Sequence, residues 1–191
     1  MISFGFKSGI GTSSRKLPSK LGGYIVGVLV LSNFGRREDL RINGFPIGKV
    51  LAKYDPNPQI KERDSSIIVI IATNAPLSFR QLKRLAKRAC HGIARVGGIS
   101  SHFSGEFVIA FTTHKRILHY PGDIALREET LHDNFISILF KAVIEATEEA
   151  ILNALFKSVT MDGRDNHIVR AIPIDKVMEV LAKYFDLLPK L

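Results

Sequence analysis

The stretch SIIVIIAT, residues 66–73, decides the fold, because it contains six consecutive apolar residues, five of them β-branched. Such a run predicts a strand that is buried inside a sheet. Two similar runs lie on either side of it. GYIVGVLVLSN over residues 23–33 predicts a buried strand before it, and EFVIAFTTH over residues 106–114 predicts a further strand after it.

Three segments show the 3.6-residue spacing of apolar side chains that is typical of helices. The first is capped by Ser78 and runs to about residue 96. The second is capped by Asn134 and runs to about residue 156, and the third spans residues 173–188 with Pro173 in its first turn. Because strands and helices intermingle along the chain, the predicted class is α/β or α+β.

Polar segments between these elements predict turns and loops. Asn43-Gly44 predicts a turn between two short strands. Residues 54–65, YDPNPQIKERDS, predict an exposed loop that ends directly at the apolar strand. GIGTSSR, residues 9–15, is rich in glycine but lacks the spacing and the lysine of a phosphate-binding loop, so it gives only weak grounds for nucleotide binding.

The composition is that of an ordinary globular protein. The 191 residues are 46% hydrophobic, so we expect one domain over residues 1–191 and exclude intrinsic disorder. No apolar run approaches the roughly 20 residues needed to cross a bilayer, and the first residues lack the apolar segment of a secretory signal. The single cysteine, Cys90, suits a reducing compartment. We therefore expect a cytoplasmic protein without a membrane partner.

The formal net charge of +9 raises the possibility of a nucleic-acid partner. The best candidate surface is the predicted helix over residues 79–96, which has six basic residues and no acidic one. Its basic positions lie opposite the apolar stripe of Leu82 and Leu85, which is the usual outer face of a packed helix. Aromatic residues do not alternate with them, as they do in single-strand binders. A basic nucleic-acid-binding module is therefore the alternative function, and we expect no nucleic acid.

Ser66 lies where the hydrophilic segment meets the apolar strand. A serine at the mouth of a buried strand is commonly just a hydrogen-bonding residue. The same position also suits a self-cleaving N-terminal nucleophile, whose hydroxyl attacks the preceding carbonyl and whose α-amine is freed when the resulting ester is hydrolysed. The new terminal serine would then attack substrates, with its own amine or a neighbour as the base. The residues alone leave both interpretations open.

Three other residues have side chains that suit the same chemistry. In Ser104-Gly105-Glu106 the glycine permits a tight turn, from which hydroxyl and carboxylate could hold or relay a proton, although a solvated loop has the same composition. Asn33, at the end of the first strand, is either a turn former or an amide donor to an oxyanion. The histidines are scattered and have no cysteine partners, so we expect neither a metal nor a cofactor.

These segments resemble the L-aminopeptidase/D-esterase and β-peptidyl aminopeptidase family over essentially the whole chain. The resemblance lies in GIGTSSR, in GYIVGVLVLSNFGRREDLRINGFPIG, in SIIVIIATNAPLSFRQLKRLAKRA and SGEFVIAFTTH, and in the blocks EATEEAILNAL and TMDGRD. It implies a four-layer αββα sandwich similar to N-terminal-nucleophile hydrolases. It also implies a self-processing serine aminopeptidase or amidase that releases N-terminal residues from peptides, amides or esters, some members accepting D- or β-amino acids.

The family pattern assigns a role to each candidate residue. Ser66 falls on the nucleophile, so that cleavage between Ser65 and Ser66 would give fragments 1–65 and 66–191. Asn33 falls on the oxyanion-stabilising asparagine, and Ser104 and Glu106 fall on the hydroxyl and the acid that assist the nucleophile. Ser65 departs from the glycine or asparagine that is usual before the nucleophile. Related acetyltransferases use threonine as the nucleophile, so a serine favours hydrolysis.

Family members have a long section before the GIGTSSR block, and that section recognises the free amine of the substrate. The chain therefore resembles a C-terminal half, and we expect the sandwich to be incomplete. A separately encoded N-terminal half is an expected partner, and a homo-oligomer is expected because an uncovered sheet face exposes apolar residues. A catalytically inactive remnant of the fold remains a further alternative.

Overall fold

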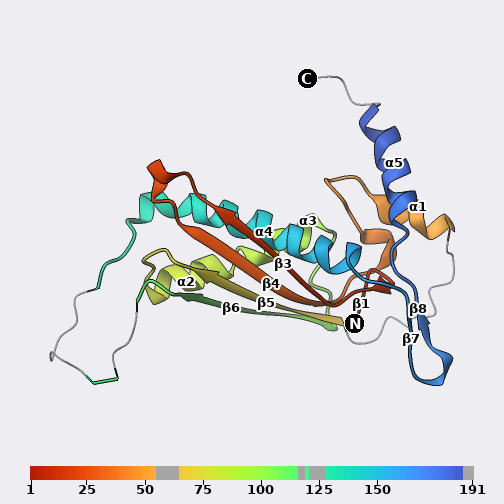
Figure 1. Ribbon diagram of the computed structural model, residues 1–191, viewed down its shortest axis with the longest axis horizontal. Coiled ribbons are helices and arrows are strands. Elements are labelled where there is room, and N and C mark those ends of the chain that lie inside the picture. Colours follow the sequence, from red (N-terminus) through yellow and green to blue (C-terminus); the bar gives the residue numbers. More distant parts are fainter. Residues whose placement is uncertain (55–64, 116–118, 121–127, 187–191) are drawn as a thin grey trace.

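The computed structural model describes residues 1–54, 65–115, 119–120 and 128–186. Its centre is a four-stranded sheet in the order β3-β4-β5-β6 (Figure 1). The strands β3 and β4 pair antiparallel, β4 and β5 pair antiparallel, and β5 and β6 pair parallel. Their bounds are Ile10–Lys16 for β3, Ile25–Asn33 for β4, Ser65–Thr73 for β5 and Ser104–Thr112 for β6.

All three strands predicted from apolar runs are confirmed, with ends that differ by two residues or fewer. The strand β3 was not predicted, because its sequence IGTSSRK has no apolar run and alternates between exposed residues and residues that are buried (Gly11) or partly buried. It covers the segment GIGTSSR except Gly9, so this segment is an edge strand and not a phosphate-binding loop.

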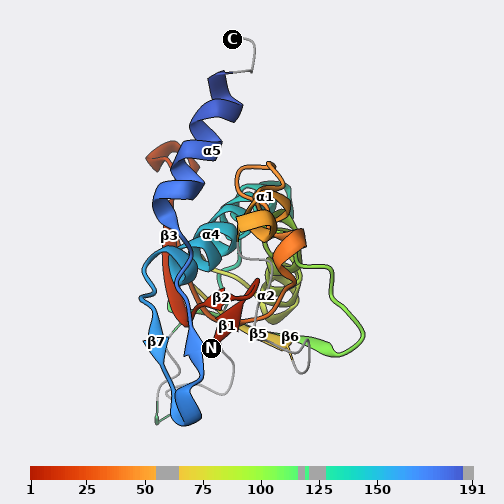
Figure 2. The same cartoon turned by 90° about the vertical axis from the view of Figure 1, so that its right-hand side faces the viewer.

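Three helices cover one face of the sheet in both views of the molecule (Figures 1 and 2). They are α2 (Phe79–Ala86), α3 (Ala89–Arg95) and α4 (Ile136–Phe156). The helix α4 lies very close to β3, because a Cβ on Gly11 would overlap the carbonyl oxygen of Ala150 and would lie 2.6 Å from the backbone nitrogen of Ala154. Small residues on both elements permit this approach.

The helix predicted over residues 78–96 is two helices. Arg88 N–H donates to the Leu85 carbonyl, a contact three residues apart that tightens the last turn of α2. The break sets α3 against α4, where a Cβ on Gly92 would lie 2.6 Å from the Cβ of Thr147. Periodicity continues through the break because both helices bury the same side of the segment, so the sequence pattern alone does not reveal it.

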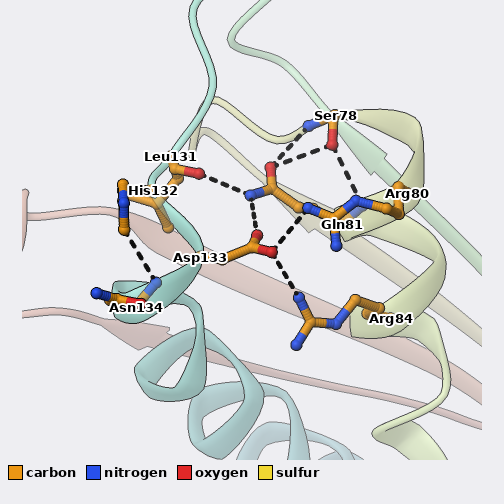
Figure 3. Close-up of polar contacts among 8 residues, drawn as sticks. All are labelled: Ser78, Arg80, Gln81, Arg84, Leu131, His132, Asp133 and Asn134. Atoms are coloured by element: carbon orange, nitrogen blue, oxygen red, sulfur yellow. Dashed lines mark hydrogen bonds and ion pairs between the residues drawn. The ribbon is translucent and has the colours of Figure 1, made fainter.

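Gln81 joins α2 to the segment before α4, as Figure 3 shows. Its buried side chain accepts the backbone N–H of Ser78 at 3.0 Å, and Ser78 Oγ accepts the N–H of Gln81, so the predicted Ser78 cap is confirmed. Gln81 Nε2 donates to the carbonyl of Leu131 at 2.6 Å and to Asp133 at 2.8 Å. The predicted Asn134 cap is wrong: a 3₁₀ turn precedes α4, and His132 Nδ1 accepts the N–H of Asn134.

The remaining elements lie around one end of the sheet, the end where β5 and β6 begin (Figure 1). The Asn43-Gly44 turn is confirmed, since both residues have positive φ and Ile42 bridges to Phe45. The two expected short strands are wrong, because this single bridge is their only pairing in the described part of the chain and a helix follows it. Residues 55–64 of the predicted loop lie outside the described residues. The short elements are β1 (Ile2–Ser3), β2 (Phe6–Lys7), α1 (Ile47–Tyr54), β7 (Met161–Asp162) and β8 (Ile168–Val169), and α5 spans Ile174–Asp186, with residues 187 and 188 of its predicted range outside the described residues.

The second face of the sheet is not covered by any helix or sheet among the described residues. Alternation along the strands points Val28, Val69 and their neighbours toward the helices and leaves the other side apolar and accessible. We call this side the open sheet face. It carries the exposed residues Ile10, Ile68, Phe107, Ile109 and Phe111, with Ile10 65%, Phe107 64% and Ile109 59% exposed.

The fold is therefore a mixed α/β structure in which one sheet has helices on one side. Helix layer and sheet correspond to two adjacent layers of the expected four-layer sandwich. The described part of the chain contains no helix that is long and apolar enough to cross a bilayer.

Candidate active site

Asn33, Ser66 and Gly105 form one row across the sheet. Asn33 is the last residue of β4 and pairs with Ser66, the second residue of β5. Ser66 in turn pairs with Gly105, the second residue of β6. Directly paired residues project to the same face of a sheet, so the side chains of Asn33 and Ser66 lie next to each other. The register thus brings two of the candidates together although they are far apart in the sequence.

The Ser66 hydroxyl lies on the open sheet face. A Cβ built on Gly105 would lie 3.7 Å from Ser66 Oγ and 3.0 Å from the ring of Phe107, so these groups share one side. The next row toward the sheet centre consists of Ile10, Leu31, Ile68 and Phe107. The candidate nucleophile therefore borders the apolar part of the open sheet face.

Ser104 and Glu106 are near Ser66 but on the other side of the sheet. Their Cα partners on β5 are Ser65 and Ile67, and Ile67 is buried on the helix side. The interpretation of Gly105 as a tight turn is wrong, because Gly105 lies inside strand β6. Alternation in an extended strand then points both side chains away from the Ser66 hydroxyl.

This placement sets Ser104 and Glu106 beside the backbone that would be cut. The Ser65-Ser66 peptide runs parallel to Ser104-Gly105 in the sheet ladder. Both Ser104 and Glu106 are partly exposed, so solvent reaches them. The backbone of Ser65 and Ser66 therefore separates their side chains from the Ser66 hydroxyl.

The amide of Asn33 has a fixed orientation. The backbone N–H of Ile2 donates to Asn33 Oδ1 at 3.0 Å. An N–H group can only donate, so the carbonyl oxygen of the carboxamide must face Ile2 and the Nδ2 group must lie on the other branch. Sequence reasoning missed this N-terminal contribution, because no motif in residues 1–4 signals it.

The residues of the site are of the types that acyl-transfer reactions use. A hydroxyl and a carboxamide share one face, and a second hydroxyl and a carboxylate lie at the same sheet end on the other face. Among the described residues, no group of three His, Cys, Asp or Glu side chains could hold a metal ion.

The family model of peptidase family S58 matches residues 1–169. The chain belongs to peptidase family S58. Among curated relatives, it is 39% identical to the β-peptidyl aminopeptidase BapA of Sphingosinicella microcystinivorans, over 96% of this chain and 50% of the relative. The chain therefore spans about half the length of the curated relatives that it matches.

Solved structures related to this S58 chain have the same backbone arrangement. A Pyrococcus horikoshii protein of known crystal structure is 48% identical, with a TM-score of 0.86 over 96% of this chain and 50% of that one. The L-aminopeptidase D-Ala-esterase/amidase of Ochrobactrum anthropi is 37% identical, with a TM-score of 0.87 over 98% of this chain and 51% of that one. The latter is described as a serine aminopeptidase and a variant of the Ntn hydrolase fold.

The basic helices of this S58 chain make contacts within the chain itself. Arg80 and Arg84 both pair with Asp133, at 2.7 and 3.2 Å (Figure 3). Arg95 pairs with Glu148 at 3.0 Å. Half of the six basic side chains in this region are thus bound to acids from the segment around α4. These contacts favour a packing role for the charge over a nucleic-acid surface.

Proposed function

We propose that this chain carries the nucleophile and the oxyanion donor of a self-processing serine aminopeptidase or amidase. The observation that supports it most strongly is the row of Asn33, Ser66 and Gly105. It places the Ser66 hydroxyl beside the Asn33 carboxamide. On the other side of Ser66, Gly105 has no side chain, so the space next to the hydroxyl is unfilled. Membership of peptidase family S58 supports the same reaction class.

In the first reaction, the chain cuts itself between Ser65 and Ser66. Ser66 Oγ attacks the carbonyl carbon of Ser65, a C–O bond forms, the C–N bond breaks, and the hydroxyl proton passes to the departing nitrogen. Breaking the C–N bond frees the Ser66 α-amine and leaves Ser65 esterified to Ser66 Oγ. Water then hydrolyses the ester, which leaves a carboxylate on Ser65 and restores the Ser66 hydroxyl. Asn33 Nδ2 donates to the oxyanion of the tetrahedral intermediate.

In the second reaction, the same hydroxyl attacks the first acyl carbon of a peptide, an amide or an ester. The free α-amine of Ser66 accepts the hydroxyl proton and returns it to the leaving group, and water hydrolyses the acyl-enzyme. Ser104 and Glu106 lie where they could hydrogen-bond to this amine and orient it. They act on the amine and not on the hydroxyl, because the sheet lies between them and the hydroxyl.

We further propose that a second sheet covers the open sheet face. This sheet would come from the half of the relatives' length that this chain does not span. The apolar row of Ile10, Leu31, Ile68 and Phe107 directly adjoins the candidate site, so the covering sheet would also wall the substrate pocket. Sheets that pack face to face bury such rows at a spacing of about 10 Å. A homo-oligomer remains a prediction.

A hydrolysis assay with aminoacyl amides and esters tests this function. The wild-type chain, Ser66→Ala and Ser65→Ala are each combined with the N-terminal half of a close family member. Only Ser66→Ala should abolish turnover, because Ser65 supplies a carbonyl and not its side chain. Turnover by Ser66→Ala equal to that of the wild type would refute the assignment.

A further inference from the structure

The first residues of the chain form a strap along the end of β4. We use this term for Ile2, Ser3 and Phe4, the strand β1 with the turn residue after it. Figure 1 shows the N-terminus at the end of the sheet where β5 and β6 begin, and therefore beside the candidate site. The strap belongs to a hairpin in which Ile2 pairs with Lys7 and Ser3 pairs with Phe6.

The strap contacts three consecutive residues: Ser32 and Asn33 at the end of β4, and Phe34 directly after it. Ser3, which is completely buried, shares a 2.7 Å hydrogen bond with the hydroxyl of Ser32. Phe4 N–H donates to the carbonyl of Phe34 at 2.9 Å. The rings of Phe4 and Phe34 meet edge to face at 5.1 Å between centroids. These contacts fix the strap on both sides of Asn33.

Between these anchors, Ile2 N–H donates to Asn33 Oδ1 at 3.0 Å. This N–H has no role in the hairpin ladder, because it points to β4. The two branches of a carboxamide differ in hydrogen bonding: the oxygen accepts and the NH2 group donates. The side-chain amide is free to rotate by 180° unless a partner selects one orientation. Ile2 selects the orientation in which the oxygen faces the strap and Nδ2 takes the other branch.

We infer that the strap positions the Asn33 carboxamide as an oxyanion donor, with the Ile2 N–H as the selecting group and Ser3 as its anchor. Both are positioning residues, since neither touches the reacting atoms. The inference rests on the proposed role of Asn33. It adds that the N-terminal segment of this chain sets the rate of the reaction at Ser66 without contacting the substrate.

The direct test removes the Ile2 N–H and keeps the strand. Ile2→Pro has no N–H, and proline is tolerated at the first residue of an edge strand. Ile2→Val is the matched control, because it keeps both the N–H and the β-branched shape. Every variant carries the same short N-terminal tag so that Met1 is retained. NMR relaxation of the Asn33 Nδ2–H bonds should give an order parameter near 0.85, about that of a rigid backbone, in the wild type and Ile2→Val, and below about 0.6 in Ile2→Pro.

The kinetic readout is the rate of the Ser66-dependent reaction. Ile2→Pro should lower kcat about tenfold or more and leave KM within about twofold, because a misplaced donor affects the transition state and not substrate binding. Equal order parameters in Ile2→Pro and Ile2→Val would overturn the inference, as would full activity in Asn33→Ala. If Ser66→Ala is as active as the wild type, the proposed function fails, and the order parameters still decide whether the strap orients Asn33.

A second pair of variants applies if Ile2→Pro does not fold. Ser3→Ala removes the anchor of the strap, whereas Ser8→Ala removes another fully buried hydroxyl, one without a hydrogen-bond partner among the described residues. Ser3→Ala should mobilise the Asn33 amide, and Ser8→Ala should leave it rigid. An Asn33 amide that is equally rigid in both variants would contradict the inference.

Discussion

At the scale of single residues, Ser66 and Asn33 were predictable as candidates because each marks the end of an apolar run. Their pairing was not predictable, since it depends on the register of β4 against β5. The position of Glu106 on the opposite side of the sheet was also hidden, because residue alternation has meaning only once the strand is known to include Ser104 and Gly105. Gly105 suggested a turn in the sequence. In the structure it lies inside a strand, where its missing side chain leaves space beside Ser66 Oγ.

Filling that space should block the reaction at Ser66. Gly105→Val places a branched side chain beside Ser66 Oγ, where a Cβ alone would lie at 3.7 Å. The substitution should lower the Ser66-dependent rate at least tenfold, and the free energy of unfolding should change by only about 1 kcal/mol, because valine favours strands and the exposed Phe107 ring is able to move. Kinetics and thermal unfolding of the same samples check both parts. A Gly105→Val protein with the wild-type rate would contradict the geometry.

At the scale of elements, apolar runs and helical periodicity were sufficient for β4, β5, β6, α4 and α5. They failed for β3, an edge strand with polar residues at alternate positions, and for α1, which follows a turn typical of a hairpin. They also failed at the α2–α3 break, because tertiary contacts with α4 decide it. Packing between elements, which no local pattern contains, accounts for each failure.

Alanine substitutions at Gly9 and Gly11 distinguish the contact with α4 from the general effect of replacing a glycine on the free energy of unfolding. Gly11→Ala should destabilise the protein by about 3 kcal/mol, because the added Cβ meets the backbone of α4 at Ala150 and Ala154, which cannot move aside. Gly9→Ala should change the free energy of unfolding by less than about 0.5 kcal/mol, because no atom lies within 4 Å of its Cβ position. Denaturant unfolding of the pair measures the difference. Equal midpoints would show that α4 does not press on β3.

The junction between α2 and α4 should be sensitive to acid. Hydrogen bonds from Gln81 and then from Arg80 hold the pKa of Asp133 below its ordinary value of 3.8. A carboxyl with a lowered pKa in the folded state stabilises the fold above the unfolded value, and this contribution is lost as the pH falls through the lowered value. Unfolding curves at pH 6 and pH 3 should therefore show a smaller acid-induced loss of stability in Asp133→Asn than in the wild type. Equal losses would mean that Asp133 has no such role.

At the scale of the whole molecule, the net charge of +9 is less informative than the distribution of apolar residues. Several of the arginines pair with acids around α4, whereas one entire face of the sheet exposes isoleucine and phenylalanine side chains. Sequence composition indicated the charge but could not show that the apolar residues gather on one uncovered side. That asymmetry agrees with a chain that spans half the length of its relatives.

The open sheet face should make the chain associate when it is expressed by itself. Ile109→Lys, in the middle of the edge strand β6 on that face, should reduce the concentration-dependent association seen by analytical ultracentrifugation, because a charge opposes burial of the face. Phe79→Lys is the control, since Phe79 is 82% exposed and begins α2 on the helix side. Association that is lowered equally by both substitutions would show that the face has no special role.

The central claim is that Ser66 cuts the bond before it and becomes the new N-terminus. The most direct measurement is the intact mass, under denaturing conditions, of the chain isolated from its native source, where whatever covers the open sheet face is present. The account predicts two products of the 191-residue chain, one of the first 65 residues and one of the remaining 126 that begins Ser-Ile-Ile-Val. A single uncut chain, or a cut at any other bond, would contradict it.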